Sequence, residues 1–568
     1  MNHTSFSVIA ACTLFAASSC GTSRQADVAP QADAAIFESF SYKGNDDFYA
    51  HNPLPDDSSF YNPILPGWYS DPTICTNGEG DYFLATSTFT YVPGVPVFHS
   101  RDLVNWTKIG HVLTRESQLK NFRHQHVSGG IFAPDIKYNP ANKTYYMITT
   151  NVGAGNFFVK TQDPFGEWSE PVYLPEVQGI DPSFFFDNDG RAYIVNNDDA
   201  PDYKPEYPGH RTVRIVEFDT ETEKCIGERK IIVNKGCRPE EKPIWCEGPH
   251  IYNVDGTYYL MTAEGGTSGW HSEVIYRGKS PMGPFEPWEG NPILAQRDLD
   301  NNRPDPVTCA GHADLVKTAE GDWWAVFLAC RPIDGDYENL GRETFMLPVK
   351  WTEDGWPYIT KHGETIPMMV SRPGVTRTDS VTFGNFEWTD NFMSPSLDME
   401  WHTLRGDAAG LYSLSAPVNH LTLKCSEIPT TEKDVAAFVG RRVQHHNYEC
   451  TTHMVFEPAD TCQHAGLVVM NQYQFAKSRN DDGNIMVLRK IDENGSTDIA
   501  SMPLDADVTG VDLRLVSKGK SYDFMFSTDR GDTWETLMSG VDARHTSTAA
   551  AGGFTGTLVG LYASKTRI

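Results

Sequence analysis

The sequence predicts an all-β protein, a five-bladed β-propeller followed by a β-sandwich. Three observations lead to this prediction. Aromatic residues make up 12% of the chain, alongside 47 Gly and 36 Pro, a composition that favours many short strands joined by tight turns. Five aromatic-rich hairpin segments recur along the first two thirds of the chain. Segments of alternating apolar and polar residues then fill the last third.

Each of the five recurring segments is a turn followed by an apolar aromatic run. The segments are GDYFLATST, NKTYYMITT, GRAYIVNN, GTYYLMTA and GDWWAVFLA, marked by Tyr82, Tyr145, Tyr193, Tyr258 and Trp323. The markers lie 63, 48, 65 and 65 residues apart, which fits a four-stranded sheet with its loops. Radial packing of such units leaves only short edges, so we expect five blades over residues 58–375.

The second region begins after the turn-rich stretch SRPGVTRTDS at 371–380. Beyond it, segments such as AGLVVMNQYQF and YDFMFSTDRGDTW alternate like the strands of a sandwich. We therefore expect a β-sandwich over residues 380–568, and no motif in it indicates a catalytic residue.

The N-terminus has the features of an export signal. Residues 6–17 are apolar and have the length of a signal-peptide core, which is too short to span a bilayer stably. The following Ser-Ser-Cys-Gly resembles the lipobox of bacterial lipoproteins, although the first 23 residues contain no Lys or Arg. The sequence thus predicts a signal over 1–20, lipidation of Cys20, and a linker or lead-in over 21–57. It predicts a periplasmic or cell-surface lipoprotein of a bacterium, whose membrane contact is this anchor alone.

The charge balance limits the choice of partner. The chain has 47 Lys+Arg against 75 Asp+Glu, a net charge of −28. Such a surface repels nucleic acid and anionic lipid, so a neutral substrate fits best.

Acidic residues recur at one position of the repeat. Eleven or twelve residues before the five markers stand Asp71, Ala133, Asp181, Glu247 and His312. The first strand of each propeller blade lines the central channel, so these positions should meet around the axis. Two carboxyl groups suffice for hydrolysis of a neutral substrate when one donates a proton to the leaving oxygen and the other, ionised, activates water or attacks carbon. A third carboxylate nearby raises the pKa of the proton donor.

Aromatic and polar residues near these positions are candidates for substrate contact. A sugar ring could stack on an aromatic side chain, although each of these aromatic residues fits a core position as well. A hydroxyl nearby could hydrogen-bond the substrate. The candidates are Trp68, Phe89, Phe132, Trp270 and Thr267.

The motifs PGWYSDPTI, SGGIFAPDIKY, GIDPSFFFDNDGRAYI, WCEGPHIY, TCAGHADLV and LGRETFMLPVKW occur in this order between residue 60 and about 375. Together they resemble glycoside hydrolase family 43, of the β-xylosidase and α-L-arabinofuranosidase type. The resemblance implies hydrolysis with inversion, with Asp71 as general base and Glu247 as general acid. It also implies that Asp181 tunes the pKa of the acid and orients it, and that Arg342 contacts substrate hydroxyls and the carboxylates.

The resemblance carries three further expectations. His312 matches an axial histidine that lies near a bound ion or water in relatives; no cofactor is required, and a structural calcium ion is left open. Phe132 stands where many relatives carry Trp. The second region resembles the concanavalin-like β-sandwich that some members append, and a loop of that domain closes the substrate pocket, which implies exo-action.

We therefore expect an exported, inverting, exo-acting glycosidase. Its products would be terminal pentose units, β-D-xylose or α-L-arabinofuranose, released from hemicellulose-derived oligosaccharides. Two alternatives stay open: a protein that binds glycan without cleaving it, and a retaining fructan-type hydrolase, since those enzymes also use five-bladed propellers.

Overall fold

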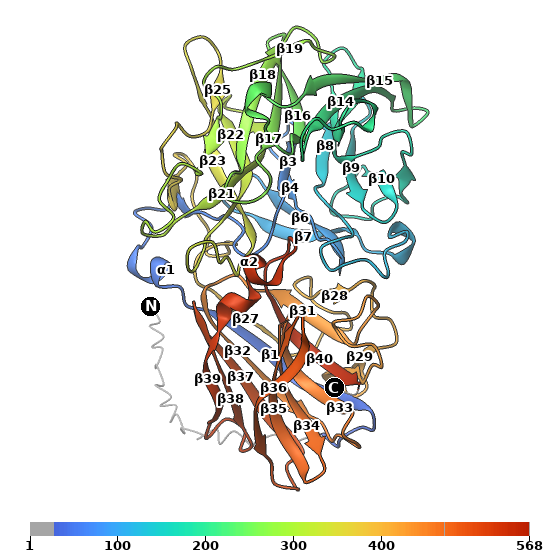
Figure 1. The fold of residues 1–568 in the computed structure, drawn as a ribbon, viewed down its shortest axis with the longest axis vertical. Coiled ribbons are helices and arrows are strands. Elements are labelled where there is room, and N and C mark those ends of the chain that lie inside the picture. Colours follow the sequence, from blue (N-terminus) through green and yellow to red (C-terminus); the bar gives the residue numbers. More distant parts are fainter. Residues whose placement is uncertain (1–27, 471, 567–568) are drawn as a thin grey trace, which may run out of the picture.

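The computed structural model describes residues 28–566 except residue 471. These residues form two all-β units. Figure 1 shows the propeller above and the sandwich below, with short helical turns only in their loops and at their junction. The predicted fold class is confirmed. Within the described residues, none of the helices has the length and apolar character needed to cross a bilayer.

Five antiparallel sheets form the blades. Each begins with an inner strand and continues outward in chain order. The inner strands are β3 (Thr73–Thr76), β8 (Asp135–Asn139), β12 (Ile180–Phe186), β16 (Glu247–Val254) and β21 (Thr308–Lys317). The strands next to them are β4 (Tyr82–Ala85), β9 (Thr144–Asn151), β13 (Ala192–Asp199), β17 (Thr257–Glu264) and β22 (Trp323–Cys330). The outer strands are β6 (Gly94–Ser100), β7 (Thr107–Leu113), β10 (Gly155–Thr161), β11 (Val172–Tyr173), β14 (Arg211–Asp219), β15 (Lys224–Asn234), β18 (Ser272–Gly278), β19 (Phe285–Pro287) and β23 (Arg342–Pro348).

The start of the propeller completes its last blade. The fifth sheet has three strands of its own, β21, β22 and β23. Leu65 exchanges two backbone hydrogen bonds with Thr344 of β23, and the Asn62 side chain bonds both backbone groups of Met346. Nearby, β2 (Ser59–Tyr61) pairs with β26 (Met369–Ser371). The two ends of the propeller are thereby hydrogen-bonded to each other, which closes the ring.

A buried charged cluster joins the inner strands at the axis. Asp314 of β21 accepts hydrogen bonds from the Thr73 hydroxyl (2.8 Å), the Ile74 N–H (2.8 Å) and the Tyr252 hydroxyl (2.7 Å). These donors belong to β3 and β16, so one carboxylate links three blades. Asp314 is fully buried, and its side chain also receives the ammonium of Lys137 from β8 at 2.6 Å.

A second carboxylate extends this cluster to the remaining blade. Asp135 of β8 accepts from the Phe184 N–H of β12 at 2.8 Å and from the Thr73 hydroxyl at 3.2 Å. Lys137 lies 3.1 Å from it as well. We call Asp135, Lys137 and Asp314 the axial brace, because together they contact the inner strands of all five blades.

The second unit is a sandwich of two antiparallel sheets around its own apolar core. One sheet has the order β29-β30-β1-β32-β37-β38-β39, with β27 paired to β1, and the other the order β31-β40-β33-β34-β35-β36. The bounds in the first sheet are β1 (Ala34–Gly44), β27 (Glu387–Asp390), β29 (Tyr412–Ser415), β30 (Val418–Lys424), β32 (Asn447–Val455), β37 (Gly510–Lys518), β38 (Ser521–Ser527) and β39 (Glu535–Asp542). In the second they are β31 (Phe438–Arg442), β33 (Gln463–Met470), β34 (Tyr473–Asn480), β35 (Gly483–Asp492), β36 (Gly495–Pro503) and β40 (Leu558–Lys565).

The prediction of a linker or lead-in over residues 21–57 is wrong for residues 34–44. Residues 34–44 form β1, which lies inside the sandwich sheet between β30 and β32. Figure 1 shows this blue strand among the orange strands of the C-terminal unit. Its apolar residues, including Phe37 and Phe40, are fully buried in the sandwich core. From residue 28 on, the described chain thus passes first through the sandwich, then builds the propeller and returns to the sandwich.

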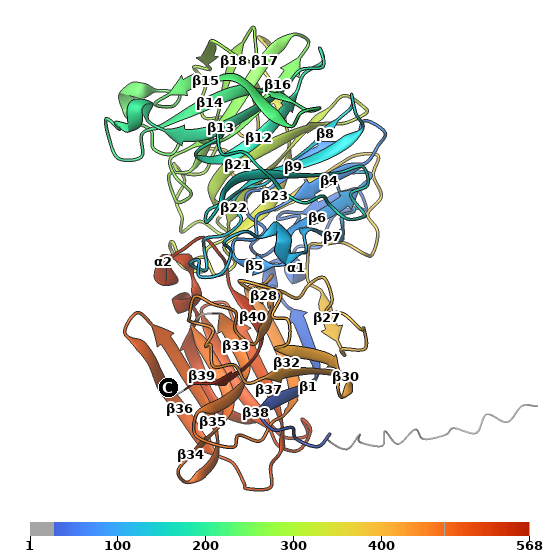
Figure 2. The ribbon, with the colours of Figure 1, turned by 90° about the vertical axis from the view of Figure 1, so that its right-hand side faces the viewer.

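The two units share a packed junction (Figure 2), where β28 (Thr403–Leu404) pairs with β5 (Tyr91–Val92) of the propeller. Arg442 of β31 is buried there. Its guanidinium lies 4.4 Å from the ring centres of both Trp68 and Tyr69 and donates to the Trp68 carbonyl at 2.8 Å. Apolar side chains of both units continue the contact as one cluster. The sandwich is therefore positioned to contribute to a site on the propeller.

Candidate active site

An unusual backbone conformation recurs in or just before three of the inner strands. Asp71, Asp181 and His312 have φ values of 55°, 51° and 52°, in the left-handed region that L-residues rarely adopt. The ladders of β12, β16 and β21 also shift register at their starts, at Ile180/Ser183, Glu247/His250 and Thr308/Gly311. Such irregularities re-aim side chains and concentrate at functional sites.

These side chains meet in one cavity of about 370 Å³. It collects the predicted Asp71, Asp181, Glu247, His312 and Arg342, which come from four different blades, together with Phe89, Phe132 and Thr267. The other lining residues are Ala133, Ile180, Ile244, Trp245, Gly265, Gly266, Ser268 and Phe554. The repeat position identified in the sequence is therefore the floor of a pocket.

Asp71 is bound by an arginine. The Arg342 Nη1 donates to its Oδ1 at 2.8 Å, and the Ser87 hydroxyl donates to its Oδ2 at 2.7 Å. Burial alone would raise the pKa of Asp71, but the charges of Arg342 and His312 and the bond from Ser87 outweigh it and lower that pKa. Asp71 is therefore an ionised carboxylate near neutral pH. Arg342 also donates to the Thr267 hydroxyl at 3.0 Å, which fixes the guanidinium between the two.

The other two carboxyl groups have pKa values shifted the opposite way. Burial, with the Asp181 and Asp71 charges beside it, raises the pKa of Glu247 well above its usual range. Burial and the Asp71 charge raise the pKa of Asp181 to about 7. The backbone N–H of Gly248, which donates to Asp181 at 3.2 Å, opposes this rise and lowers the pKa. Glu247 is therefore a protonated acid at the pH where Asp71 is ionised.

This arrangement has the parts of general acid–base hydrolysis. An ionised carboxylate can activate water, and a protonated carboxyl can donate to a leaving oxygen in the same pocket. The charge of a third carboxyl, Asp181, in the same cavity keeps the donor protonated. The geometry thus provides for cleavage of a neutral acetal with no charge brought by the substrate.

Two predicted substrate contacts do not line the cavity. Trp68 is 0% exposed and packs against Phe89 and Tyr91 beneath the pocket, because the sandwich covers it with Arg442. Trp270 is 69% exposed and does not line the cavity, since its loop brings Thr267 inward instead. Trp68 supports the floor of the pocket, and Trp270 lies outside it.

The structure adds residues that the sequence does not reveal. Phe554 comes from the sandwich, stacks on Phe89 at 6.1 Å with 22° between the rings, and lies 5.7 Å from the Arg342 guanidinium. Its loop therefore walls the pocket. His271 is buried beside the axis and bonds the Cys309 carbonyl through Nδ1 at 2.9 Å. Ser87, the third addition, binds Asp71 as described.

The donor set around His312 does not fit the calcium ion left open by the sequence. Calcium binds through six to eight oxygens. The groups near His312 include the imidazole of His271, the cationic guanidinium of Arg342, Asp314, and Asp71, whose oxygens already accept from Arg342 and Ser87. Within the described part of the chain, the acidic and histidine cluster spaced for a metal is Asp135–His250–Asp314, below the pocket, and there the Lys137 ammonium supplies the positive charge.

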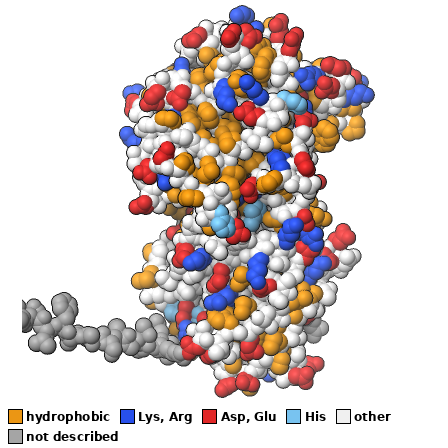
Figure 3. Space-filling model, turned by 90° about the vertical axis from the view of Figure 1, so that its left-hand side faces the viewer, with side chains coloured by type: hydrophobic (Ala, Val, Ile, Leu, Met, Phe, Trp, Pro, Cys, Tyr) orange, Lys and Arg blue, Asp and Glu red, His pale blue; other side chains and the backbone are white. Residues whose placement is uncertain are grey.

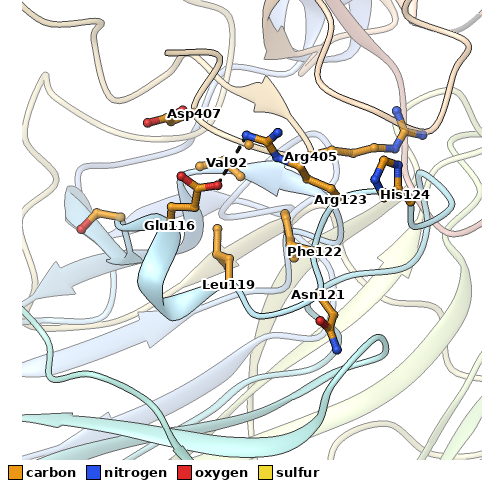
Figure 4. Close-up of a pocket in the computed structure, with 11 residues that line it drawn as sticks. Val92, Glu116, Leu119, Asn121, Phe122, Arg123, His124, Arg405 and Asp407 are labelled. Atoms are coloured by element: carbon orange, nitrogen blue, oxygen red, sulfur yellow. Dashed lines mark hydrogen bonds and ion pairs between the residues drawn. The ribbon is translucent and has the colours of Figure 1, made fainter.

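A separate cavity of about 410 Å³ lies at the junction of the two units (Figure 4). Figure 4 shows Glu116 and Arg123 of the propeller paired across it, 3.4 Å apart, facing Arg405 and Asp407 from the sandwich side. Arg405 is buried and donates to the carbonyls of Gln125 and Glu432 at 2.8 Å each. This cavity holds none of the three carboxyl groups and belongs to the contact between the units.

The fold and the pocket together define a propeller hydrolase whose chemistry rests on carboxyl groups. The comparison with known families agrees. Residues 60–357 match glycosyl hydrolases family 43, and residues 389–567 match the β-xylosidase C-terminal concanavalin A-like domain. The chain belongs to glycosyl hydrolases family 43, and it is a glycosidase of the exo-acting, inverting kind.

Relatives cover nearly the whole chain. It is 35% identical over 517 residues to a non-reducing end α-L-arabinofuranosidase of Bacteroides ovatus, covering 89% of this chain and 91% of that protein. It is 33% identical over 537 residues to a β-xylosidase of Bacillus subtilis, covering 89% and 96%. Among solved structures, a GH43_12 protein from capybara gut metagenome matches with 40% identity and a TM-score of 0.86, over 94% of this chain and 100% of that one.

The role of Arg342 in the ionisation of Asp71 is open to a direct test. In Arg342→Gln the pKa of Asp71 should rise, because burial is no longer opposed by the guanidinium. The acidic limb of the kcat/KM profile should then move up by about one pH unit or more. Arg211→Gln is the matched control, because Arg211 lowers the pKa of Glu247 and stands 5.0 Å from the Trp245 ring. Arg211→Gln should move the alkaline limb of the profile to higher pH. An acidic limb that stays in place in Arg342→Gln would contradict the role of Arg342 in keeping Asp71 ionised.

Proposed function

We propose that the protein releases single terminal pentose units, β-D-xylose or α-L-arabinofuranose, from hemicellulose-derived oligosaccharides. In this proposal Asp71 is the general base that activates water and Glu247 is the general acid that protonates the leaving oxygen. Asp181 keeps Glu247 protonated and oriented, and Arg342 holds Asp71 ionised. The observation that carries the proposal is the opposite shift of the Asp71 and Glu247 pKa values inside one walled pocket.

Exo-action follows from the shape of the pocket. Phe89 and Phe132 form one wall, and Phe554 of the sandwich packs against both, with ring centres 6.1 Å from each. A cavity of about 370 Å³ walled in this way accepts the end of a chain more readily than its middle. Phe554 is 40% exposed, so its ring face is available to a sugar.

The choice of sugar rests on the relatives. Their names include α-L-arabinofuranosidase, β-xylosidase and, for a protein of Butyrivibrio fibrisolvens 35% identical over 519 residues, xylosidase/arabinosidase. These names support activity on both pentoses, and we favour xylose slightly. Neutral sugars also agree with the net charge of −28.

The acid and base roles predict different responses to the leaving group. Glu247→Gln should lower kcat/KM on xylo-oligosaccharides about 10²- to 10⁴-fold, because the departing hydroxyl needs a proton. The same variant should lose far less on 2,4-dinitrophenyl glycosides, whose leaving group departs as an anion. Asp71→Asn should lose activity on both substrates. The measurement is steady-state kinetics on paired β-xylopyranosides and α-arabinofuranosides, with proton NMR of the first-formed anomer.

Three outcomes would contradict the proposal. Equal losses of Glu247→Gln on both leaving groups would remove its role as acid. Net retention of anomeric configuration would remove water activation from Asp71 and favour the fructan-type alternative. Turnover of neither glycoside by the unaltered protein would remove the pentose assignment.

We further propose that the protein is exported and lipidated at Cys20. The apolar run at 6–17 and the Ser-Ser-Cys-Gly sequence support this; residues 1–27 lie outside the described part of the structure. Cys20→Ser should shift the protein from the detergent phase to the aqueous phase in a detergent partition assay. Cys12→Ser, in the same leader, is the matched control and should stay in the detergent phase. Equal partition of the two variants would contradict lipidation.

A further inference from the structure

A large groove lies at the far end of the propeller from the active site. Its volume is about 890 Å³, more than twice the 370 Å³ of the catalytic pocket. It lies between blades four and five, where the turn after β16 faces the turn after β21 and the hairpin of β24 (Lys350–Trp351) and β25 (Pro357–Tyr358). Its lining residues are Val254, Asp255, Thr257, Tyr259, Arg277, Gly278, Lys279, Pro284, Glu286, Lys317, Gly321, Trp323, Trp351, Asp354 and Gly355.

The groove and the catalytic pocket share no residue but share two strands. Strand β16 carries Glu247 at its start and Val254 at its end, which places the two sites about 23 Å apart along the strand. Strand β21 likewise carries His312 in the pocket and Lys317 in the groove. The groove therefore cannot serve as a subsite of the catalytic pocket.

Aromatic rings form the base of the groove. Trp323 and Trp351 are partly exposed, with ring centres 6.0 Å apart and an angle of 64° between the rings. Tyr259 packs edge-on against Trp351 at 5.6 Å, which supports that ring from behind. The indole rings of Trp323 and Trp351 therefore give the groove two flat apolar surfaces that are inclined to each other. Figure 3 shows the face that carries β22, β23 and β25, where hydrophobic side chains gather on the propeller half.

The polar groups around the rings are free to bind a ligand. Four charged side chains make no ion pair and no side-chain hydrogen bond with any other described residue; they are Asp255, Lys279, Glu286 and Lys317. The Lys317 ammonium lies 5.9 Å from the Trp323 ring centre, so it stands over the aromatic base. Arg277 is held in place by the Asp354 carbonyl at 3.1 Å.

The charge of the lining selects the class of ligand. Three basic and three acidic side chains face the groove, so its formal charge is zero in a chain of net charge −28. A polyanion would meet the acidic side chains, and a purely apolar ligand would leave the four unpaired charged side chains without partners. A neutral chain with many hydroxyls satisfies both constraints, because it places ring C–H faces on the indoles and hydroxyls against the donors and acceptors.

We propose that this groove is a second glycan-binding site, which holds the neutral main chain of a pentose-containing polysaccharide while the catalytic pocket trims chain ends. The proposal rests on the proposed function for the choice of glycan. It gives the protein two contacts with one substrate, on opposite ends of the propeller. Holding a main chain at the groove raises the effective concentration of chain ends at the pocket.

The test measures binding and turnover separately. Isothermal titration of xylohexaose into Glu247→Gln, which blocks turnover, should reveal two sites per chain. Adding Trp323→Ala and Trp351→Ala should remove one site, or weaken it at least about tenfold. With Glu247 intact, the double tryptophan variant should keep kcat/KM on 4-nitrophenyl β-xylopyranoside within about twofold and lose rate on insoluble xylan.

Two controls keep folding apart from binding. Trp534→Ala removes a partly buried tryptophan from the sandwich, where it packs on Arg514 at 3.8 Å, and should leave both sites in place. Trp351→Phe retains a ring and should restore most of the groove affinity. If the double tryptophan variant bound xylohexaose with unchanged stoichiometry and affinity, the proposal that the groove binds glycan would be overturned. Normal glycoside turnover in that case would leave the proposed function standing, whereas absent glycoside turnover in the unaltered protein would show that the proposed function itself had failed.

Discussion

The catalytic pocket depends on the axial brace of Asp135, Lys137 and Asp314. Two buried carboxylates share one partly buried ammonium, and their remaining lone pairs accept hydrogen bonds from the inner strands of the other blades. Desolvation makes such a cluster costly unless every charge is paired and bonded. Here the pairing joins all five blades at one point, so the position of each inner strand is set relative to the others. The catalytic side chains stand on those same strands.

A second group of carboxyls lies above the brace and has a different charge pattern. In the brace, a cation neutralises two acids. In the pocket, Arg342 pairs with Asp71, and among the described residues no basic side chain lies within ion-pair distance of Asp181 or Glu247. Arg342 therefore keeps Asp71 ionised, whereas Glu247 stays protonated and the pKa of Asp181 rises to about 7. Left-handed φ values at Asp71 and Asp181 turn these carboxyls out of their ladders and into the cavity. The sandwich then walls the pocket with Phe554 and covers its support, Trp68.

The sequence predicted the carboxyl groups well because they recur in one register of a repeat, which constrains five distant positions at once. It could not predict Phe554, since a Gly-Gly-Phe loop 212 residues after Arg342 shows no periodicity that links it to the propeller. The sequence could not place Trp68 and Trp270, because a tryptophan near a site fits a stacking platform, a core position or an exposed loop equally well; packing buries Trp68 beneath the pocket and leaves Trp270 69% exposed. Residues 34–44 looked like a lead-in because their partner strand β32 lies about 400 residues further along the chain.

The Lys137 charge holds the propeller axis and, through it, the catalytic geometry. The most direct measurement compares Lys137→Met with Lys224→Met, an exposed lysine on the outermost strand of blade three, in thermal unfolding and in kcat/KM. We predict that Lys137→Met loses about 3–5 kcal/mol of stability, because two buried carboxylates lose their cation, and that its activity falls as well. Lys224→Met should match the unaltered protein. If Lys137→Met and Lys224→Met had equal thermal stability and equal kcat/KM, this role of Lys137 would be contradicted.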